Sequence, residues 1–513
     1  MFRIAASRQM IVWLAGCLLL EGCVAVRGSV SGSELAGVVS LVPVEFAQDR
    51  TGRETTIQLC RLDRSCRCRY CPSPQSVPIP TREIAARDSN EAEKPAADEP
   101  VDPGPTNSPE EQPEDETEAD SEADSEAEGE ESSDEEEEEG PSGVLDFIPH
   151  QVGPLTAEAI YQGEWYSNTR GGLNTNHATR YRGNIDLIIN GDLEELFGWE
   201  GTSLFLYGGQ VHGESISLKD VGDWQILSEI DPAPLVNVTQ MQEYWLRQEY
   251  LDGQLYFKLG RQDANADFGF SDLAGDFVNN SFVTIPTIPF PVWPAQSLGV
   301  SGFLQLSEDW TLGAGLYESN RLNSLWGEPL HDKRGQIALG HLEWRTQSGP
   351  QGQLPGTWRA GAWLDNGEWG EITTAPVAKV FCNNYGFWFS GDQLLFKEQY
   401  GTDDEQGLGI FCEIGWSPGD RNFIDQYYGV GLVYRGLIPG RDEDLIGFGM
   451  ADIEFSRQTF ARDGLEYETA VELFYKAQVS ENLTIQPDIQ LIANPGGNGR
   501  DALAVGLRFE LVL

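Results

Sequence analysis

Several segments in the C-terminal part of the chain carry polar or charged side chains at every second position, with apolar ones between them. Because successive side chains of a β-strand point to opposite faces, such a segment predicts a strand with one polar and one apolar face. A polar face that also carries aromatic rings can hold a hydroxyl-rich solute weakly, through hydrogen bonds and flat apolar surfaces. The clearest polar faces are those of Arg180, Arg182, Asn184 and Asp186, of Glu243, Trp245, Arg247 and Glu249, and of Arg359 and Trp363.

A long connection between two of these segments adds further candidates. Residues 262–295 are rich in apolar and aromatic side chains, which a fully solvated loop would rarely contain. If the strands close into a barrel, we expect this loop to fold into its lumen and narrow it. The apolar side chains concerned are Phe268, Phe270, Phe277, Phe282 and Trp293. The alternative is that its polar residues only anchor it to the inner wall. The candidates here are Arg261, Asp263, Asp267 and Asn280, and Glu468 and Glu472 extend the polar set toward the C-terminus.

Motifs for catalysis are missing from the sequence. The five histidines have no H-E-x-x-H spacing, and neither G-x-S-x-G nor G-x-x-x-x-G-K-[ST] occurs. We therefore predict no enzymatic activity and no cofactor, although some outer-membrane barrels are lipases or proteases.

Six of the eight cysteines precede residue 150, where the alternating segments begin, and four of those fall in one short stretch. Their C-x5-C-x-C-x2-C spacing differs from the paired C-x2-C arrangement of ordinary zinc sites, so local disulfides or an unstructured segment are favoured over a metal site. The four are Cys60, Cys66, Cys68 and Cys71, within a segment of unknown fold over 27–87. Cys382 and Cys412 either pair across neighbouring strands or remain free thiols.

The first residues have the pattern of an export signal. Arg3 and Arg8 precede an apolar run from Met10 to Leu20, which predicts a signal peptide over 1–26. Cys17 and Cys23 each leave open a lipoprotein signal with an acylated cysteine. No later stretch reaches the roughly 18 apolar residues of a membrane-spanning helix, so membrane insertion must come from strands.

Half of the net charge of −48 comes from one acidic tract that precedes the alternating segments. Residues 88–140 contain 25 acidic residues and one basic residue, Lys94. Such a tract buries too little apolar surface to fold, so 88–142 is predicted to be a disordered linker. A spacer is favoured over loose binding of divalent cations, because the tract lacks the ligand pattern of a calcium loop. Nucleic acid is an unsuitable partner for so acidic a chain.

Residues 150–513 contain sixteen segments in which polar and apolar side chains alternate, separated by turn residues. The fold class is therefore all-β: a transmembrane antiparallel β-barrel of about 16 strands behind a disordered acidic linker. Long connections follow odd strands and short turns follow even ones, as in an outer-membrane barrel, and sixteen strands leave an aqueous lumen. The segments are 158–167, 178–190, 202–212, 240–250, 253–262, 296–306, 309–318, 335–346, 357–366, 385–396, 406–417, 424–436, 444–456, 465–479, 481–492 and 502–513.

Three blocks of sequence give the barrel region a specific resemblance. They are Tyr181-Arg-Gly-Asn-Ile-Asp-Leu with Asp192-Leu-Glu-Glu-Leu-Phe-Gly-Trp-Glu-Gly201, then Glu243-Tyr-Trp-Leu-Arg-Gln-Glu249 with Lys258-Leu-Gly-Arg-Gln-Asp263, then the segments from Tyr434 to Asp444, Glu472 to Tyr475 and Pro487 to Pro495. Together, over about 157–513, they resemble the carbohydrate-selective porin family of the OprB type.

This resemblance implies a sixteen-stranded outer-membrane pore for facilitated diffusion of sugars, typically glucose-like monosaccharides. The expected partners are carbohydrate solutes and outer-membrane lipid, with the chain a monomer or a homotrimer. A competing hypothesis is a general or structural barrel that anchors the chain while its acidic N-terminal part contacts the cell wall. Deleting residues 30–140 would separate the two, because only an adaptor would lose envelope attachment while uptake continued.

Overall fold

The computed structural model describes residues 151–233, 237–319, 335–349, 352–400 and 405–513. The predicted signal peptide, the cysteine-bearing segment and the acidic linker lie outside these residues. None of the helices in the described part of the chain is long and apolar enough to cross a membrane.

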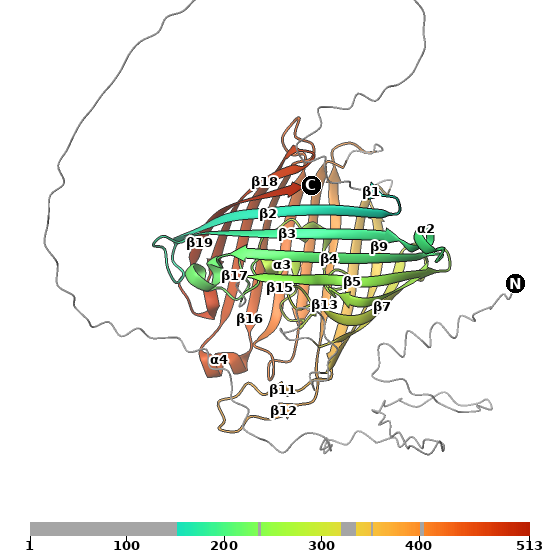
Figure 1. Ribbon diagram of the computed structural model, residues 1–513. Helices are drawn as coiled ribbons and strands as arrows, with labels where there is room; N and C mark the ends of the chain where they lie inside the picture. Colours follow the sequence, from blue (N-terminus) through green and yellow to red (C-terminus); the bar gives the residue numbers. More distant parts are fainter. Residues whose placement is uncertain (1–150, 234–236, 320–334, 350–351, 401–404) are drawn as a thin grey trace, which may run out of the picture. The chain divides into compact units, whose positions relative to one another are not determined.

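Sixteen strands pair antiparallel in chain order, and the last strand pairs with the first, which closes a barrel (Figure 1). The predicted fold class and all sixteen predicted strands are confirmed. Among the largest differences in boundaries is β2, predicted as 158–167. The strands are β2 (Leu155–Arg170), β3 (Thr179–Asp192), β4 (Thr202–Gly213), β5 (Val238–Tyr250), β6 (Leu255–Gln262), β7 (Ser297–Gln305), β8 (Trp310–Glu318), β9 (Gln336–Ser348), β10 (Leu354–Asp365), β13 (Asn384–Lys397), β14 (Gly407–Trp416), β15 (Ile424–Arg435), β16 (Leu445–Phe455), β17 (Tyr467–Ser480), β18 (Leu483–Ala493) and β19 (Ala502–Val512).

Three very short strands accompany the barrel. β1 (Gln151–Val152) pairs with the start of β2. β11 (Trp369–Gly370) and β12 (Val380–Phe381) form a separate hairpin in the connection between β10 and β13. These strands add nothing to the closure of the barrel.

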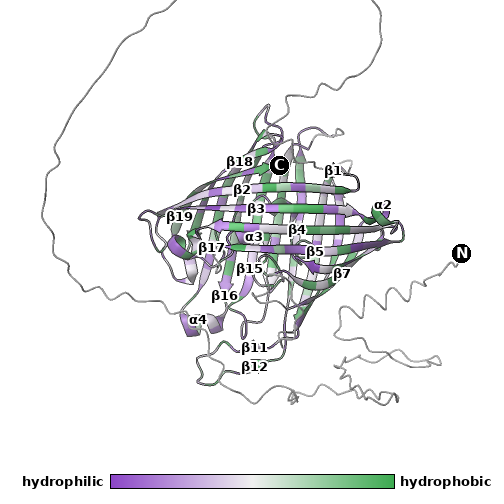
Figure 2. Ribbon diagram, in the orientation of Figure 1, coloured by the Kyte–Doolittle hydropathy of each residue, from purple (hydrophilic) through white to green (hydrophobic). Residues whose placement is uncertain are grey.

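The alternation in sequence separates an outer apolar face from an inner polar face. On β3, Ile185 and Leu187 are 44% and 50% exposed on the outside, whereas Arg182 is 2% exposed on the inside. On β19, Leu507 is exposed and Arg508 is buried in the same way. Figure 2 shows this alternation along the strands at the front of the barrel.

Tight turns and one capped helical turn join the strands at one end of the barrel. The β5–β6 turn places Leu251, Asp252 and Gly253 at positive φ, and glycine adopts this conformation without steric cost. Between β3 and β4, the helix α2 (Leu193–Phe197) begins at Asp192, whose carboxylate accepts the N–H groups of Glu194 and Glu195. We call this the short-turn end.

Two long connections leave the opposite end and fold into the lumen. The first, described over residues 214–233, includes η1 (Ser217–Val221), and the second, residues 263–296, includes η2 (Asp272–Ala274) and α3 (Asn280–Val283). The predicted inward fold of the second loop is observed: Phe268, Phe277 and Phe282 are fully buried. The inward fold of the first loop was not predicted. The remaining helices are α4 (Arg457–Asp463), between β16 and β17, and η3 (Pro495–Gly497), between β18 and β19.

The apolar core therefore lies inside the barrel, between the second loop and the wall. The ring of Phe277 lies 4.5 Å from that of Phe282, 5.3 Å from that of Phe411 and 5.0 Å from that of Phe474, measured between centroids. Such contacts fix the loop against β14 and β17.

Phe277→Ala is expected to lower the free energy of unfolding by about 3–5 kcal/mol, because it leaves a cavity among these rings. Thermal unfolding in detergent, followed by circular dichroism, measures the change. Phe448→Ala is the matched control: Phe448 is 53% exposed on the outer face of β16, so its loss should cost much less. Equal effects of the two substitutions would contradict a loop-centred core.

Candidate functional site: the barrel lumen

The inner face of β3 carries the first group of predicted lining residues. Arg182 is buried and forms an ion pair with Asp231 of the first inward loop, with 3.3 Å between Nη2 and Oδ1. Asn184 donates its amide N–H to Asp186 at 2.6 Å. All three side chains point inward, as alternation predicts, and Arg182 also holds the loop.

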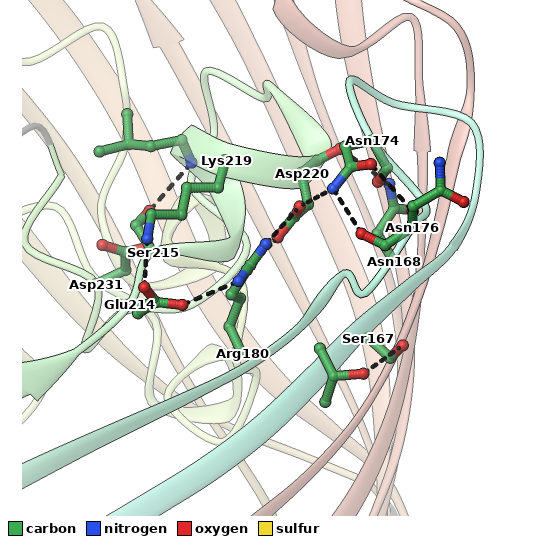
Figure 3. A network of polar contacts seen from close by, with 12 residues as sticks. Ser167, Asn168, Asn174, Asn176, Arg180, Glu214, Ser215, Lys219, Asp220 and Asp231 are labelled. Atoms are coloured by element: carbon green, nitrogen blue, oxygen red, sulfur yellow. Dashed lines mark hydrogen bonds and ion pairs between the residues drawn. The ribbon is translucent and has the colours of Figure 1, made fainter. Parts of the chain in front are cut away.

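Arg180 lies two residues before Arg182 on β3, toward the end of the barrel from which the long loops leave, and it contacts the start of the same loop (Figure 3). Its Nε lies 2.5 Å from Asp220 Oδ2, and its Nη1 lies 2.9 Å from Glu214 Oε2. Asp220 also accepts a hydrogen bond from the side chain of Asn174, and Glu214 pairs with Lys219. Arg180 therefore tethers two acidic residues of the loop at the mouth of the barrel.

A β-bulge turns two neighbouring residues of β5 inward. The register with β4 shifts between Tyr207 and Gly208, so that Gln242 and Glu243 are both buried on the lumen side. Beyond the bulge, Trp245 stacks on Phe205 with 4.7 Å between ring centroids. The sequence pattern predicted the inward direction of Glu243 and Trp245 but gave no sign of the bulge.

Aromatic rings and cations alternate across β4, β5 and β6. Lys258 Nζ lies 4.8 Å from the centroid of the Trp245 ring, and the guanidinium of Arg247 lies 4.0 Å from that of Tyr256. Arg247 also pairs with Glu249 at 2.7 Å. We call the set Phe205, Tyr207, Trp245 and Tyr256 the aromatic strip. Beside it, at the short-turn end, a cavity of about 400 Å³ is lined by Thr156, Asn190, Trp245 and Glu249, among others.

Carboxylates on the opposite wall accept backbone N–H groups of the inward loops. Glu472 accepts from Val278 at 2.6 Å and from Asn279 at 2.9 Å. Glu468 accepts from Trp224 and Gln225 of the first loop, and both glutamates are fully buried. These two predicted lining residues therefore do not face an open path. They anchor loops, because a buried N–H without a partner is costly.

The same anchoring holds for a third carboxylate, which the sequence analysis did not single out. Asp392 of β13 accepts from the hydroxyl of Ser271 and from the N–H groups of Asp272 and Leu273. Its hydrogen-bond donors all belong to the second loop, which is far from β13 in the sequence. Sequence alternation shows only that Asp392 lies on the inner face.

Three predicted candidates lie at or near the start of the second loop, and a fourth lies in its middle. Arg261 is fully buried and donates to Gln240 at 3.3 Å, so it is not accessible from the lumen. Asp263 accepts the N–H groups of Asn265 and Trp293, and Asp267 pairs with Lys258 at 2.7 Å. The remaining candidate, Asn280, begins α3, and its N–H donates to the carbonyl of Ile226 in the first loop.

The last two candidates lie on β10. Arg359 is buried, pairs with Glu343 at 3.0 Å, and has its guanidinium 4.0 Å from the ring centroid of Phe270. Trp363 points inward but is only 2% exposed, with Gly386 beneath its ring. Trp363 is therefore packed into the wall and does not present its ring to the lumen.

Other lumen residues were missed because their partners lie far away in sequence. Lys476 of β17 pairs with Asp276 of the second loop at 3.0 Å, with both side chains about one quarter exposed. Arg508 of β19 pairs with Glu164 of β2 at 3.0 Å and with Glu229 of the first loop. The alternation around Arg508 marked it as inward, but no local signal identifies its partners.

Two chemical alternatives raised by the sequence can be assessed over the described residues. No disulfide joins Cys382 and Cys412. Within the same residues, no group of three or more histidine, cysteine, aspartate or glutamate side chains is placed to hold a metal ion.

Glu472→Gln is expected to loosen the second loop. An amide has one acceptor oxygen, so one of the two loop N–H groups loses its partner at a cost of about 1–3 kcal/mol. In planar bilayers the variant should show larger open-channel current noise and higher conductance. Glu510→Gln is the matched control, because Glu510 accepts a single side-chain hydrogen bond, from Gln162. Current traces indistinguishable from wild type would rule out the anchoring role.

Asp263 makes stability depend on pH. Burial raises its pKa to about 6, and hydrogen bonds from backbone N–H groups, first that of Trp293, offset only part of this shift. The unfolded pKa is about 3.9, so the folded protein binds more protons between the two values, and stability falls as pH rises from about 4 to about 6. Asp263→Asn should flatten this dependence in thermal unfolding measured across that interval.

The difference between wild type and Asp263→Asn isolates this residue from Asp223 and Asp231, whose pKa values burial also raises to about 6. Parallel curves for the two proteins would show that Asp263 does not titrate in this range.

Comparisons with known proteins agree with this architecture. Residues 176–513 match the model of the carbohydrate-selective porin, OprB family. Porin B of Pseudomonas aeruginosa is 26% identical over 69% of this chain and 86% of that protein, and a putative porin, QuiX, of Acinetobacter baylyi is 24% identical over 67% and 86%. The high-pH structure of OprB from Pseudomonas putida matches 70% of this chain and 94% of its own, with a TM-score of 0.63 and 23% identity. The chain therefore belongs to the carbohydrate-selective porin family of the OprB type.

Proposed function

We propose that this protein lies in the outer membrane and lets glucose-like monosaccharides diffuse through its lumen without an energy source. The observation that supports this proposal is the aromatic strip on the inner wall. Phe205 and Trp245 stack with 4.7 Å between their centroids, and Tyr256 adds a further ring on the next strand, nearer the short-turn end. Family membership gives the general class of solute, and the strip gives the contact surface.

The charged groups beside the strip suit a neutral solute. Glu243 accepts a hydrogen bond from Trp245 Nε1 at 3.2 Å, and Arg247 and Glu249 are paired with each other. Paired charges offer donors and acceptors to sugar hydroxyls while exerting little net attraction on an ion. Each contact is weak, and weak repeated contacts allow entry and release, which flux requires.

The two inward loops narrow the lumen in front of the strip. Asp392 of β13, Glu472 of β17 and Arg508 of β19 hold them at the opposite wall. Arg182 of β3 and Lys258 of β6 hold them beside the strip. A solute would therefore pass between the loops and the strip. Of the predicted lining residues, Asp186, Glu243, Trp245 and Arg247 are the ones we propose to lie along this passage.

Trp245→Ala is expected to weaken block of the channel by glucose about threefold to tenfold, because a well-placed ring contact contributes about 0.5–1.5 kcal/mol. Planar-bilayer conductance in KCl, titrated with glucose, maltose and an uncharged non-sugar of similar size, measures it. Trp165→Ala is the matched control, since Trp165 is 46% exposed on the outer face. Wild-type channels indifferent to every sugar would overturn the proposal and leave a general pore.

A further inference from the structure

A second cavity lies under the second inward loop, on the side facing the short-turn end. It encloses about 260 Å³ between the loop residues Ala266–Phe270 and the inner faces of strands β6 to β9. The β5–β6 turn, with Gly253 and Gln254, forms its rim. Its walls include Tyr256, Phe270, Phe303, His341, Glu343 and Arg345. Trp245, which lines the larger cavity, does not line this one.

The charges around this cavity are already paired. Asp267 lies 2.7 Å from Lys258, and Glu343 lies 3.0 Å from both Arg345 and Arg359. An ion entering the cavity would have to displace one of these partners. A neutral polyol would instead add hydrogen bonds to carboxylate oxygens and guanidinium N–H groups that remain charged.

One buried polar atom in the wall has no partner. His341 is 5% exposed, and its Nδ1 makes no hydrogen bond among the described residues. The Nε2–Cδ2 edge of its ring lies against Gly313 of β8, so Nδ1 is on the edge that faces away from that strand. This nitrogen is enclosed by protein atoms and offers no surface to a ligand. The hydrogen-bonding groups that a ligand can reach are those of Gln305, Glu343 and Arg345, which line the cavity and are exposed or half-buried.

Aromatic rings complete the walls. Tyr256 and Phe303 stack with 5.0 Å between centroids, and Phe268 and Phe303 flank the His341 ring at 4.9 and 6.0 Å. Arg359 occupies one face of Phe270. These contacts hold the apolar walls in fixed positions, so the cavity is formed in advance of any ligand.

We propose that this cavity binds one monosaccharide molecule, as a second sugar site separate from the cavity beside Trp245. The inference rests on the proposed sugar-porin function and extends it. The volume is close to the lower end of the range of about 300–1,000 Å³ for small-molecule sites, which suits a single hexose ring and excludes a longer oligosaccharide. The rim at the β5–β6 turn makes the short-turn end the side from which the site fills.

The test measures D-glucose binding to the full chain in detergent by saturation-transfer NMR, in a Trp245→Ala background that weakens the strip. Thr311 lines the cavity from β8, so Thr311→Trp fills it and should weaken the remaining binding at least tenfold. Thr239→Trp is the matched control: Thr239 is exposed on the outer face of β5, and binding should stay as in the background.

Arg345→Met provides a second variant that does not depend on filling the cavity. It removes the guanidinium donors and keeps the length of a side chain that is about half exposed, so thermal stability should stay close to wild type while glucose binding weakens. A purely structural arginine would not separate the two readouts in this way. Unchanged glucose binding in both Thr311→Trp and Arg345→Met would overturn the inference.

Glucose entry into proteoliposomes containing the wild-type protein separates this inference from the function on which it rests. Entry of glucose together with no saturation transfer in the Trp245→Ala background would overturn the second site and leave the pore intact. Failure of glucose to enter would overturn the proposed function itself.

Discussion

Every backbone N–H that the inward loops bring into the barrel needs an acceptor, and this requirement determines how the lumen is built. The strand ladders use the hydrogen bonds of the wall, so the loops pair their N–H groups partly with loop carbonyls, as Glu229 does with Val278, and partly with side chains of the wall. Glu472, Glu468 and Asp392 each accept two or more N–H or O–H groups from a loop. A carboxylate is suited to this role because both oxygens accept, and the charge strengthens each bond. The loops are thereby held in one position, and the free space of the lumen is fixed with them.

The loops are held on both sides of the barrel, but by different kinds of contact. The carboxylates that accept several loop N–H groups lie on β13 and β17, and the aromatic core around Phe277 packs against the same wall. On the other side, Arg182 of β3 and Lys258 of β6 hold the loops through ion pairs. Both cavities are lined by residues of β2 to β9 and the loop residues facing them. The passage that we propose uses the space that these contacts leave between the loops and β2 to β9.

The strands could be predicted because their signal is local. Two-residue alternation, as in Ile185, Asp186 and Leu187, reports burial directly, and turn residues such as Gly253 mark the ends. The inward fold of residues 263–296 was also predictable, since its phenylalanines need burial. The fold of residues 214–233 was not, because its anchors are single contacts such as Arg182 with Asp231, between residues far apart in sequence. Alternation likewise identified Glu468 and Trp363 as inward-facing, yet it could not distinguish an anchor or a packed ring from a residue that meets solute.

Pairing of charges links the architecture to the kind of solute. A lumen held together by buried carboxylates would attract cations strongly if those charges were free. Here Asp267, Glu343 and Glu164 each have a cationic partner, and Glu472 has backbone donors. Each pair exerts less attraction on a passing ion than an unpaired carboxylate would, while the density of donors and acceptors stays high. Neutral hydroxylated molecules can exchange hydrogen bonds with water for hydrogen bonds with such a wall. The proposed passage of sugars is therefore compatible with the same contacts that hold the loops.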